Sequence, residues 1–234
     1  PARLFIRHDF ANLHLVQQQL EEVEAELQRL STTEPWAKDL PFLMQIPGIG
    51  LLSALAIQAA IGDVSRFGAA RKLVGYAGLG SRVHDSGKIH RTGRITKSGR
   101  RDLRYALIEA ARAAVQHHPY WATVAAKLGA RIGEKKALVA IARRLLVTIW
   151  QVLTKREADL HAEPERVATK FMRWSWELKP QHRQGLQSRE FIRWKLEPLG
   201  IGAELTHLTY GKMPRRVASA EELWKKRPDL RPPD

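Results

Sequence analysis

The stretch LGSRVHDSGKIHRTGRITKSGRRDLR, residues 79–104, organises the rest of the chain, because it combines dense positive charge, glycine and a central hydroxyl. Its eight lysines and arginines against two aspartates leave six net positive charges, a large share of the +15 of the whole chain. Six of the sixteen glycines lie between residues 75 and 99, and glycine lets a backbone turn sharply or approach a ligand closely. The pattern predicts a loop that handles phosphodiesters.

The basic side chains of this stretch are candidate phosphate ligands. Together with one histidine they are Arg82, His84, Lys88, Arg91, Arg94, Lys97, Arg100, Arg101 and Arg104. The last three open an expected helix over residues 100–117, where their charge opposes the positive end of the helix dipole. An anion bound between them would remove this conflict, and a solvated basic face is the alternative.

Ser86 lies in the middle of the stretch, in the sequence Asp-Ser-Gly-Lys, and two interpretations compete for it. Asp, Ser and Gly in succession are ordinary turn residues, which Val83 and Ile89 could flank in a short β-hairpin. Alternatively, a serine on a cation-lined turn could attack a phosphorus atom whose charge nearby lysine and arginine neutralise. No general base is identified, because the two neighbouring histidines are better suited to donate hydrogen bonds to phosphate.

Residues 9–34 are predicted to form a helix whose apolar positions alternate in steps of three and four. These positions are Leu13, Val16, Leu20, Val23, Leu27 and Leu30, and they define the heptad seam of the helix. Such a seam indicates either a coiled coil between copies of the chain or a helix packed on its own domain. Barely three heptads would make an isolated coiled coil marginal, so both alternatives stand.

Residues 40–67 contain Met-Gln-Ile-Pro-Gly-Ile-Gly, residues 44–50, followed by an apolar helix pattern. The arrangement resembles a helix-hairpin-helix element. The amides of Gly48 and Gly50 would then lie at a helix start, where unpaired N–H groups and the helix dipole favour a phosphate oxygen. A tight turn between two helices without a ligand is the alternative.

Several motifs, taken in order, resemble the C-terminal transposase domain of the bacterial insertion-sequence transposases that pair a RuvC-like domain with a serine nucleophile. The matching pieces are Pro47-Gly48-Ile49-Gly50, Tyr76-Ala77-Gly78-Leu79, Ser81-Arg82-Val83-His84-Asp85-Ser86-Gly87-Lys88, Gly93-Arg94-Ile95-Thr96-Lys97-Ser98-Gly99 and Arg101-Asp102-Leu103-Arg104. They cover about residues 40–155, and the ordered set is far more specific than any one piece. The resemblance implies that Ser86 is catalytic and that a structured guide RNA selects the DNA sites.

The same family has a helical connector between its RuvC-like and transposase domains, and residues 9–34 are similar to it. No RuvC-like domain is recognised in this sequence. In the family that domain's acidic residues hold the divalent ions, so no metal site is expected in this chain. Mg²⁺ is expected only with the missing domain. The resemblance also implies a cytoplasmic, nucleoid-associated bacterial protein.

Composition favours nucleic acid as the partner. The chain carries 39 Lys and Arg against 24 Asp and Glu, a balance that suits a polyanion. No apolar run approaches the length needed to span a bilayer, and the basic residues are not confined to one amphipathic helix, so no membrane partner is expected. The absence of cysteine excludes disulfides and thiolate metal sites, and the histidines show no ligand spacing.

The sequence therefore predicts an all-α protein in three parts. A coiled-coil-like connector helix occupies residues 9–34, a transposase domain with its catalytic loop occupies residues 40–155, and an accessory helical segment occupies residues 156–234. Helices over residues 100–117 and 134–155 follow from apolar spacing. The last part holds four tryptophans and is too aromatic for a disordered tail; they are Trp174, Trp176, Trp194 and Trp224.

Two functions fit this reading. In the first, Ser86 attacks a DNA phosphodiester during transposition, four basic residues hold phosphates, and the chain self-associates through the heptad seam. The four are Lys88, Arg91, Arg94 and Arg101. In the second, the chain is a helix-hairpin-helix module that binds DNA or RNA and performs no chemistry.

Overall fold

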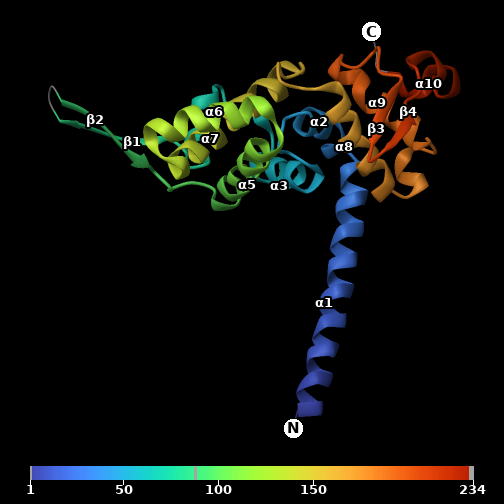
Figure 1. Ribbon diagram of the computed structural model, residues 1–234, viewed down its shortest axis with the longest axis horizontal. Coiled ribbons are helices and arrows are strands. Elements are labelled where there is room, and N and C mark those ends of the chain that lie inside the picture. Colours follow the sequence, from blue (N-terminus) through green and yellow to red (C-terminus); the bar gives the residue numbers. More distant parts are fainter. Residues whose placement is uncertain (1, 87–88, 232–234) are drawn as a thin grey trace.

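Helices dominate the computed structural model, which describes residues 2–86 and 89–231 (Figure 1). They are α1 (Ala2–Ser31), α2 (Trp36–Met44), α3 (Leu51–Ile61), α4 (Ala70–Tyr76), α5 (Arg101–His117), α6 (Pro119–Ile132), α7 (Glu134–Lys155), α8 (Pro164–Glu177), α9 (Ser188–Leu196) and α10 (Ala220–Lys226). Two antiparallel hairpins join them, β1 (Ser81–Ser86) with β2 (Ile89–Ile95) and β3 (His207–Tyr210) with β4 (Met213–Arg216). The expected all-α class is confirmed in its main feature.

Helix α7 is the central element of the core. It packs against α2, α4, α5 and α6, and Ile141, Leu145 and Ile149 on its inner side are fully buried. A spacing of four residues places these side chains on one helix face. Each such burial contributes about 2 kcal/mol of hydrophobic stabilisation. The helix predicted over residues 134–155 is thus confirmed.

Helix α7 also corrects the expectation that no apolar run reaches the length of a membrane span. By length and composition alone its 22 residues could cross a membrane. The central helix of a folded core meets the same criteria, and α7 packs its apolar side against other helices while Arg143 and Arg144 are exposed. Its composition is therefore weak evidence for a membrane span.

The C-terminal segment shares the core with the preceding helices. One continuous buried cluster runs from Leu40 through α7 to Phe171, Trp174 and Phe191. The guanidinium of Arg193 is also buried there and donates to the carbonyl oxygens of Gly202, Leu205 and Ala218 at 2.7, 2.7 and 2.8 Å. These bonds satisfy donors of the buried guanidinium and connect α9 to the chain on both sides of the β3–β4 hairpin. Residues 156–234, which were expected to be helical, also contain the β3–β4 hairpin.

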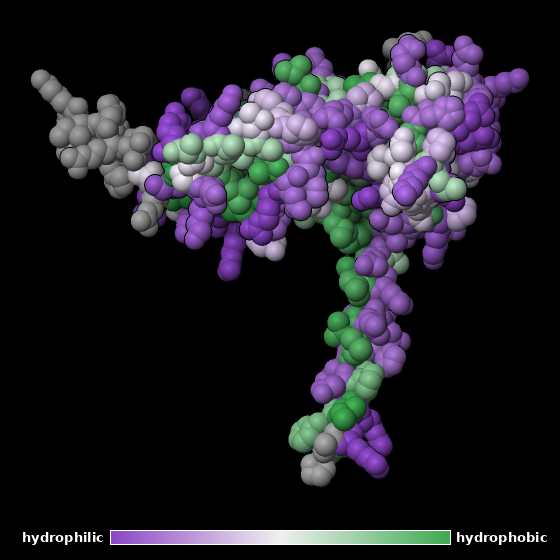
Figure 2. All heavy atoms as spheres, in the orientation of Figure 1, coloured by the Kyte–Doolittle hydropathy of each residue, from purple (hydrophilic) through white to green (hydrophobic). Residues whose placement is uncertain are grey.

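Helix α1 projects from the body as a single long rod (Figure 1). It begins at Ala2, seven residues before the predicted start, and ends at Ser31. Figure 2 shows apolar side chains along one side of the rod and polar side chains along the other. Only the C-terminal end meets the body: Leu27 is packed against the core, and the Trp174 indole N–H donates to the Ser31 hydroxyl at 3.0 Å.

The middle of the heptad seam is exposed in a single chain. Leu13, Val16, Leu20 and Val23 keep between 50 and 59% of their surface accessible. The same helix also exposes larger side chains nearer its start, which are Leu4, Phe5, Ile6 and Phe10. An isolated helix gains no stability from apolar side chains that remain in water. The outer part of α1 thus lacks the apolar partner that its pattern requires.

The glycine-rich stretch forms the β1–β2 hairpin, which projects from the opposite end of the body to β3–β4 (Figure 1). Ser81 pairs with Ile95, Val83 with Thr92 and Ser86 with Ile89, and the register shifts between Ser81 and Val83. A bulge of this kind bends a strand and increases its twist. The hairpin expected around Ser86 is present, but Asp85 and Ser86, which the sequence placed in the turn, belong to the paired part of β1: Asp85 pairs with His90.

Candidate nucleic-acid interface

The turn between α2 and α3 has the geometry of a helix hairpin, as the sequence predicted. Gly48 has φ +83°, a conformation that glycine adopts without strain. A Cβ atom on Gly48 would lie 2.1 Å from the Ala110 carbonyl oxygen and 2.7 Å from the Ala114 amide nitrogen. Gly48 therefore lets the turn lie directly on the backbone of α5, where alanines leave room. The side of this residue that faces α5 is closed to any ligand.

Gly50 differs from Gly48 in both conformation and surroundings. It is exposed, has φ −99°, and has no heavy atom within 4 Å of an added Cβ. As the N-cap of α3 it supplies no side chain, so the first amides of the helix have no capping side chain. Unpaired N–H groups and the helix dipole favour an anion at this end. Gly50 is thus the open half of the predicted pair.

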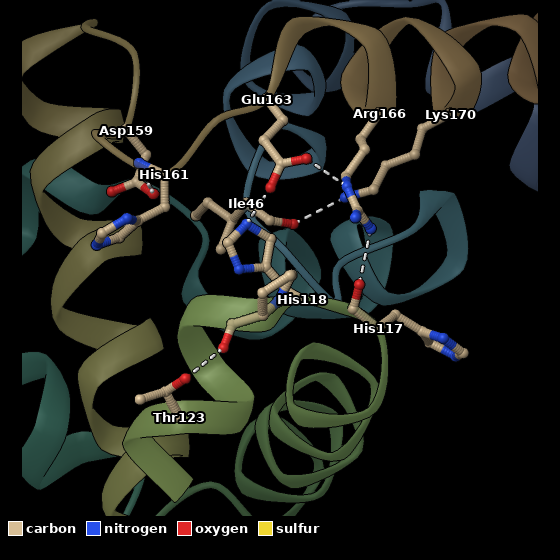
Figure 3. A network of polar contacts seen from close by, with 10 residues as sticks. Ile46, His117, His118, Thr123, Asp159, His161, Glu163, Arg166 and Lys170 are labelled. Carbon is tan, nitrogen blue, oxygen red and sulfur yellow. Dashed lines mark hydrogen bonds and ion pairs between the residues drawn. The ribbon is translucent and has the colours of Figure 1, made fainter. Parts of the chain in front are cut away.

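A lysine from the C-terminal segment binds the backbone of the α2–α3 turn. The Lys170 ammonium of α8 donates to the carbonyl oxygens of Met44, Ile46 and Ile49 at 2.7, 2.8 and 2.9 Å. Figure 3 shows the contact with Ile46. Burial lowers the pKa of Lys170 to about 7. The three carbonyl oxygens oppose that shift, because each accepts a hydrogen bond from the charged form. Gln45 adds a second tie, since its side-chain oxygen accepts from the Asp159 amide at 3.0 Å.

The start of α5 gathers three arginines with different surroundings. Arg100 forms a bidentate pair with Asp102, at 2.9 and 2.5 Å, and this hydrogen bonding lowers the pKa of Asp102 to about 2. Arg104 donates to the Ala77 carbonyl oxygen at 3.0 Å. Arg101 is exposed and forms no hydrogen bond or ion pair with the described residues. Of the three arginines predicted to bind an anion, Arg101 is therefore the one without a partner among the described residues.

The base of the β1–β2 hairpin is tied tightly to the body. A Cβ on Gly99 would lie 2.3 Å from the Tyr76 carbonyl oxygen and 2.5 Å from the Gly78 amide nitrogen. The Arg100 amide donates to Tyr76 at 2.8 Å and the Lys97 amide to Gly78 at 3.1 Å. The two backbone segments that lead into and out of the hairpin, residues 76–78 and 97–100, are thus in direct contact. This contact fixes the direction in which the hairpin projects.

Ser86 is the last residue of β1 and lies at the far end of the hairpin, away from the helices (Figure 1). Lys88, a predicted phosphate ligand, lies outside the described residues. His84, Arg91 and Arg94 lie on the two strands, with His84 paired with Arg91. Arg82 near the base donates to the Thr96 carbonyl oxygen at 3.4 Å, and Lys97 follows β2.

The predicted site residues thus form three groups instead of one cluster. Ser86, His84, Arg91 and Arg94 belong to the hairpin, Arg100, Arg101 and Arg104 to the start of α5, and Gly48 and Gly50 to the α2–α3 turn. Because Gly48 contacts α5 at Ala110 and Ala114, the turn lies roughly 15 Å along the helix from Arg101. Surfaces separated in this way suit an extended polyanion better than a small ligand.

A further group of polar side chains next to the turn is absent from the sequence prediction. Arg166 donates to the His117 carbonyl oxygen at 2.7 Å and pairs with Glu163, whose other oxygen lies 2.9 Å from His118 Nε2 (Figure 3). With Gly48, Lys170 and other residues they line a cavity of about 360 Å³. Arg166, Lys170 and Arg173 are four and three residues apart, a spacing that puts them on one face of α8. That spacing was the available signal in the sequence.

The described residues contain no group of three or more His, Asp or Glu side chains that could hold a metal ion. Among these described residues, therefore, no side-chain group fits the divalent ion that the family resemblance implies. No step of the chemistry below is assigned to a metal on this chain. The expectation that Mg²⁺ comes with another domain stays a prediction.

Residues 40–126, from α2 into α6, match the family described as Transposase IS116/IS110/IS902 family. The matched residues contain the α2–α3 turn, the β1–β2 hairpin and the whole of α5. The resemblance seen in the sequence is confirmed at this level. The match concerns the domain as a whole and assigns no role to a single residue.

Three similar proteins support the same assignment. The transposase for insertion sequence element IS1111A of Coxiella burnetii is 33% identical over 127 residues, which are 51% of this chain and 34% of that protein. An uncharacterized 43.6 kDa protein of insertion element IS110 from Streptomyces coelicolor is 27% identical over 144 residues, 61% of this chain and 35% of its own length. A pilin gene-inverting protein of Moraxella bovis is 36% identical over 114 residues, 47% of this chain and 35% of its own length.

The chain spans about a third of the length of these curated relatives. Two are named for mobile DNA elements and one for the inversion of a gene.

Proposed function

We propose that this chain acts in DNA transposition or recombination, as the part of a transposase that binds nucleic acid and carries a serine nucleophile. The observation that carries the proposal is the β1–β2 hairpin, which bears Ser86 and several basic residues, lies within the residues that match a transposase family and projects from the helical body (Figure 1). A group that must reach a phosphodiester inside a large nucleic-acid assembly benefits from a position on a projecting hairpin. The names of the similar proteins support this choice of process.

Binding would depend mainly on phosphate contacts. The hairpin and the start of α5 concentrate six net positive charges in residues 79–104, and Arg101 has no partner among the described residues. The amides at Gly50 would add a contact without charge. Phosphate contacts release counterions, so affinity falls steeply as salt concentration rises.

The binding proposal predicts a specific change in that salt dependence. Arg101→Ala and Arg94→Ala should each flatten the plot of log affinity against log salt by about one unit, because each removes one phosphate contact. Affinity for a DNA duplex would be measured by fluorescence anisotropy across a salt series.

Arg215→Ala is the matched control for this measurement. Arg215 is exposed on β4, at the opposite end of the body from the β1–β2 hairpin (Figure 1). Its substitution by alanine removes one positive charge, as the other two substitutions do. Its slope should equal that of the wild type. A salt-independent affinity, no binding at low salt, or equal slopes for all three variants would contradict phosphate binding by this surface.

In the proposed chemistry, the Ser86 oxygen attacks a DNA phosphorus. A P–O bond forms to serine as the P–O bond to one deoxyribose oxygen breaks, and the serine proton finally resides on that leaving oxygen. Positive charge from Arg91, Arg94 and Lys88 would stabilise the phosphate as its charge develops. An unaided serine hydroxyl is a poor nucleophile, so the reaction requires groups from outside the described chain. A structured guide RNA that selects the DNA sites belongs to the same proposal.

We also propose that α1 pairs with the α1 of a second copy. Its seam is regular, and Leu13, Val16, Leu20 and Val23 are exposed and have no apolar partner among the described residues. Leu13→Asp with Leu20→Asp should convert the associated form to a monomer, because pairing would bury two unpaired charges. Sedimentation velocity would measure the mass. Leu27 is kept, since it also packs on the body.

Gln18→Asp with Ala25→Asp is the control pair, because these residues lie on the opposite face of the heptad. This variant adds the same charge and should keep the mass of the wild type. If the wild type sediments as a monomer throughout the micromolar range, pairing through α1 is wrong.

A binding module without chemistry is the second candidate function. The α2–α3 helix hairpin and the separation of Ser86 from the other site groups favour it. The two candidates differ in whether Ser86 forms a bond to DNA, and they share the binding surface.

A further inference from the structure

Lys170 satisfies three carbonyl oxygens of one short turn with a single ammonium group. The carbonyls belong to Met44, Ile46 and Ile49, and the distances to Nζ lie between 2.7 and 2.9 Å. An ammonium has three N–H donors, so this arrangement uses all of them. Carbonyl oxygens that converge in this way repel one another unless a cation lies between them. The turn is thus built around a positive charge that a side chain supplies.

The position of Lys170 also determines where one amide points. In a trans peptide unit the C=O and the next N–H point in opposite directions. Because the Ile49 oxygen points at Lys170, the N–H of Gly50 points away from it, on the exposed side of the turn. A hydrogen bond to the oxygen also polarises the same amide and strengthens it as a donor. Lys170 therefore acts on Gly50 through the peptide unit between them.

We propose that Lys170 is the built-in cation of the α2–α3 turn and a positioning residue that aims the Gly50 amide at a nucleic-acid phosphate. The second half of this statement rests on the proposed function. The residue comes from α8, which lies beyond the matched residues 40–126, so the C-terminal segment completes the turn. A lysine that served only to fill space would need neither its charge nor its three donors.

The proposal predicts chemical rescue by a small cation. Lys170→Ala leaves the three carbonyl oxygens around an empty space, which an ammonium or potassium ion from solution can occupy. Lys170→Met keeps most of the side-chain volume but offers no donor, so it blocks that space. The two variants lose the same hydrogen bonds and differ only in whether a free cation fits.

The first measurement is thermal unfolding of the whole chain at pH 6, in choline, potassium or ammonium chloride at equal ionic strength. In choline both variants should unfold at a Tm about 5 °C or more below the wild type, because three buried acceptors lose their partner. Ammonium or potassium should restore at least half of this loss in Lys170→Ala and none in Lys170→Met. The wild type should show the same Tm in all three salts.

The second measurement is affinity for a DNA duplex under the same three salts. Lys170→Ala should bind about tenfold more weakly than the wild type in choline and should recover in ammonium. This arm separates the two proposals. If the wild type itself does not bind DNA at low salt, the proposed function is wrong, while the cation role is still decided by the Tm values.

Several results would overturn the inference. One is a Tm for Lys170→Ala in choline equal to that of the wild type, and another is equal recovery of the alanine and methionine variants. Failure of Lys170→Ala to fold in every salt would also count against it, because the vacated carbonyls would then accept no free cation. If ammonium restores the Tm of Lys170→Ala but this variant binds DNA as tightly as the wild type in every salt, the proposed orientation of the Gly50 amide is wrong. The cation role of Lys170 would then still stand.

Discussion

Gly48→Ala is expected to destabilise the chain by roughly 3 kcal/mol or more, whereas Gly50→Ala should stay within about 1 kcal/mol of the wild type. The methyl group at residue 48 would lie 2.1 Å from a backbone oxygen of α5, and φ is +83°. Backbone atoms inside two packed helices cannot move aside cheaply. At residue 50 the added methyl meets nothing within 4 Å and φ is −99°.

Urea unfolding measures both variants, since a shift in midpoint at unchanged slope reports a change in stability. The two variants distinguish the roles of the two glycines, which the Pro-Gly-Ile-Gly sequence does not. Gly48 allows close packing, whereas Gly50 presents solvent-facing amides. Equal stability of the two variants would contradict the close approach of the turn to α5.

Ser86→Ala is expected to abolish a covalent protein–DNA adduct while leaving DNA affinity unchanged. The chain would be supplied with a RuvC-like domain, Mg²⁺ and any guide RNA, because the described residues hold no metal cluster and no general base is identified. Loss of the hydroxyl removes the only atom that can bond to phosphorus at this residue, so the expected effect is total. The adduct appears as a slower-migrating band under denaturing conditions.

Ser81→Ala and Ser98→Ala are the matched controls, because each removes one hydroxyl from the same stretch. Ser81 begins β1 near the hairpin base, and Ser98 follows β2. Both variants should still form the adduct. If Ser86→Ala forms it, or if either control abolishes it, Ser86 is only a turn residue. The binding-module function would then be favoured.

Local patterns predicted the elements well because each depends on residues close together in sequence. The three-and-four spacing around Leu13 and Leu20 predicts α1, and the spacing around Leu145 predicts α7. Turn residues at Ser86 allowed a hairpin, which the structure contains. Periodicity and turn chemistry act over one or two turns of chain, so a single sequence is sufficient to detect them.

The same patterns failed where a residue's role depends on a distant partner. Arg104 shares the basic pattern of Arg101, yet it donates to the Ala77 carbonyl oxygen. Lys170 lies 121 residues from Ile49, one of the three carbonyls that it binds. α7 has the composition of a membrane span, and only its neighbours show that its apolar side packs in a core.

The sequence by itself determined the helical class, the net positive charge of residues 79–104 and the resemblance to a transposase domain, and it allowed a hairpin at Ser86. Only the tertiary structure decided that Gly48 is packed while Gly50 is open, that the site residues form three separate groups, and that Lys170 completes the turn. The physical reason is one of range. Charge, propensity and periodicity are properties of neighbouring residues, whereas burial and hydrogen-bond partners arise only when segments far apart in sequence pack together.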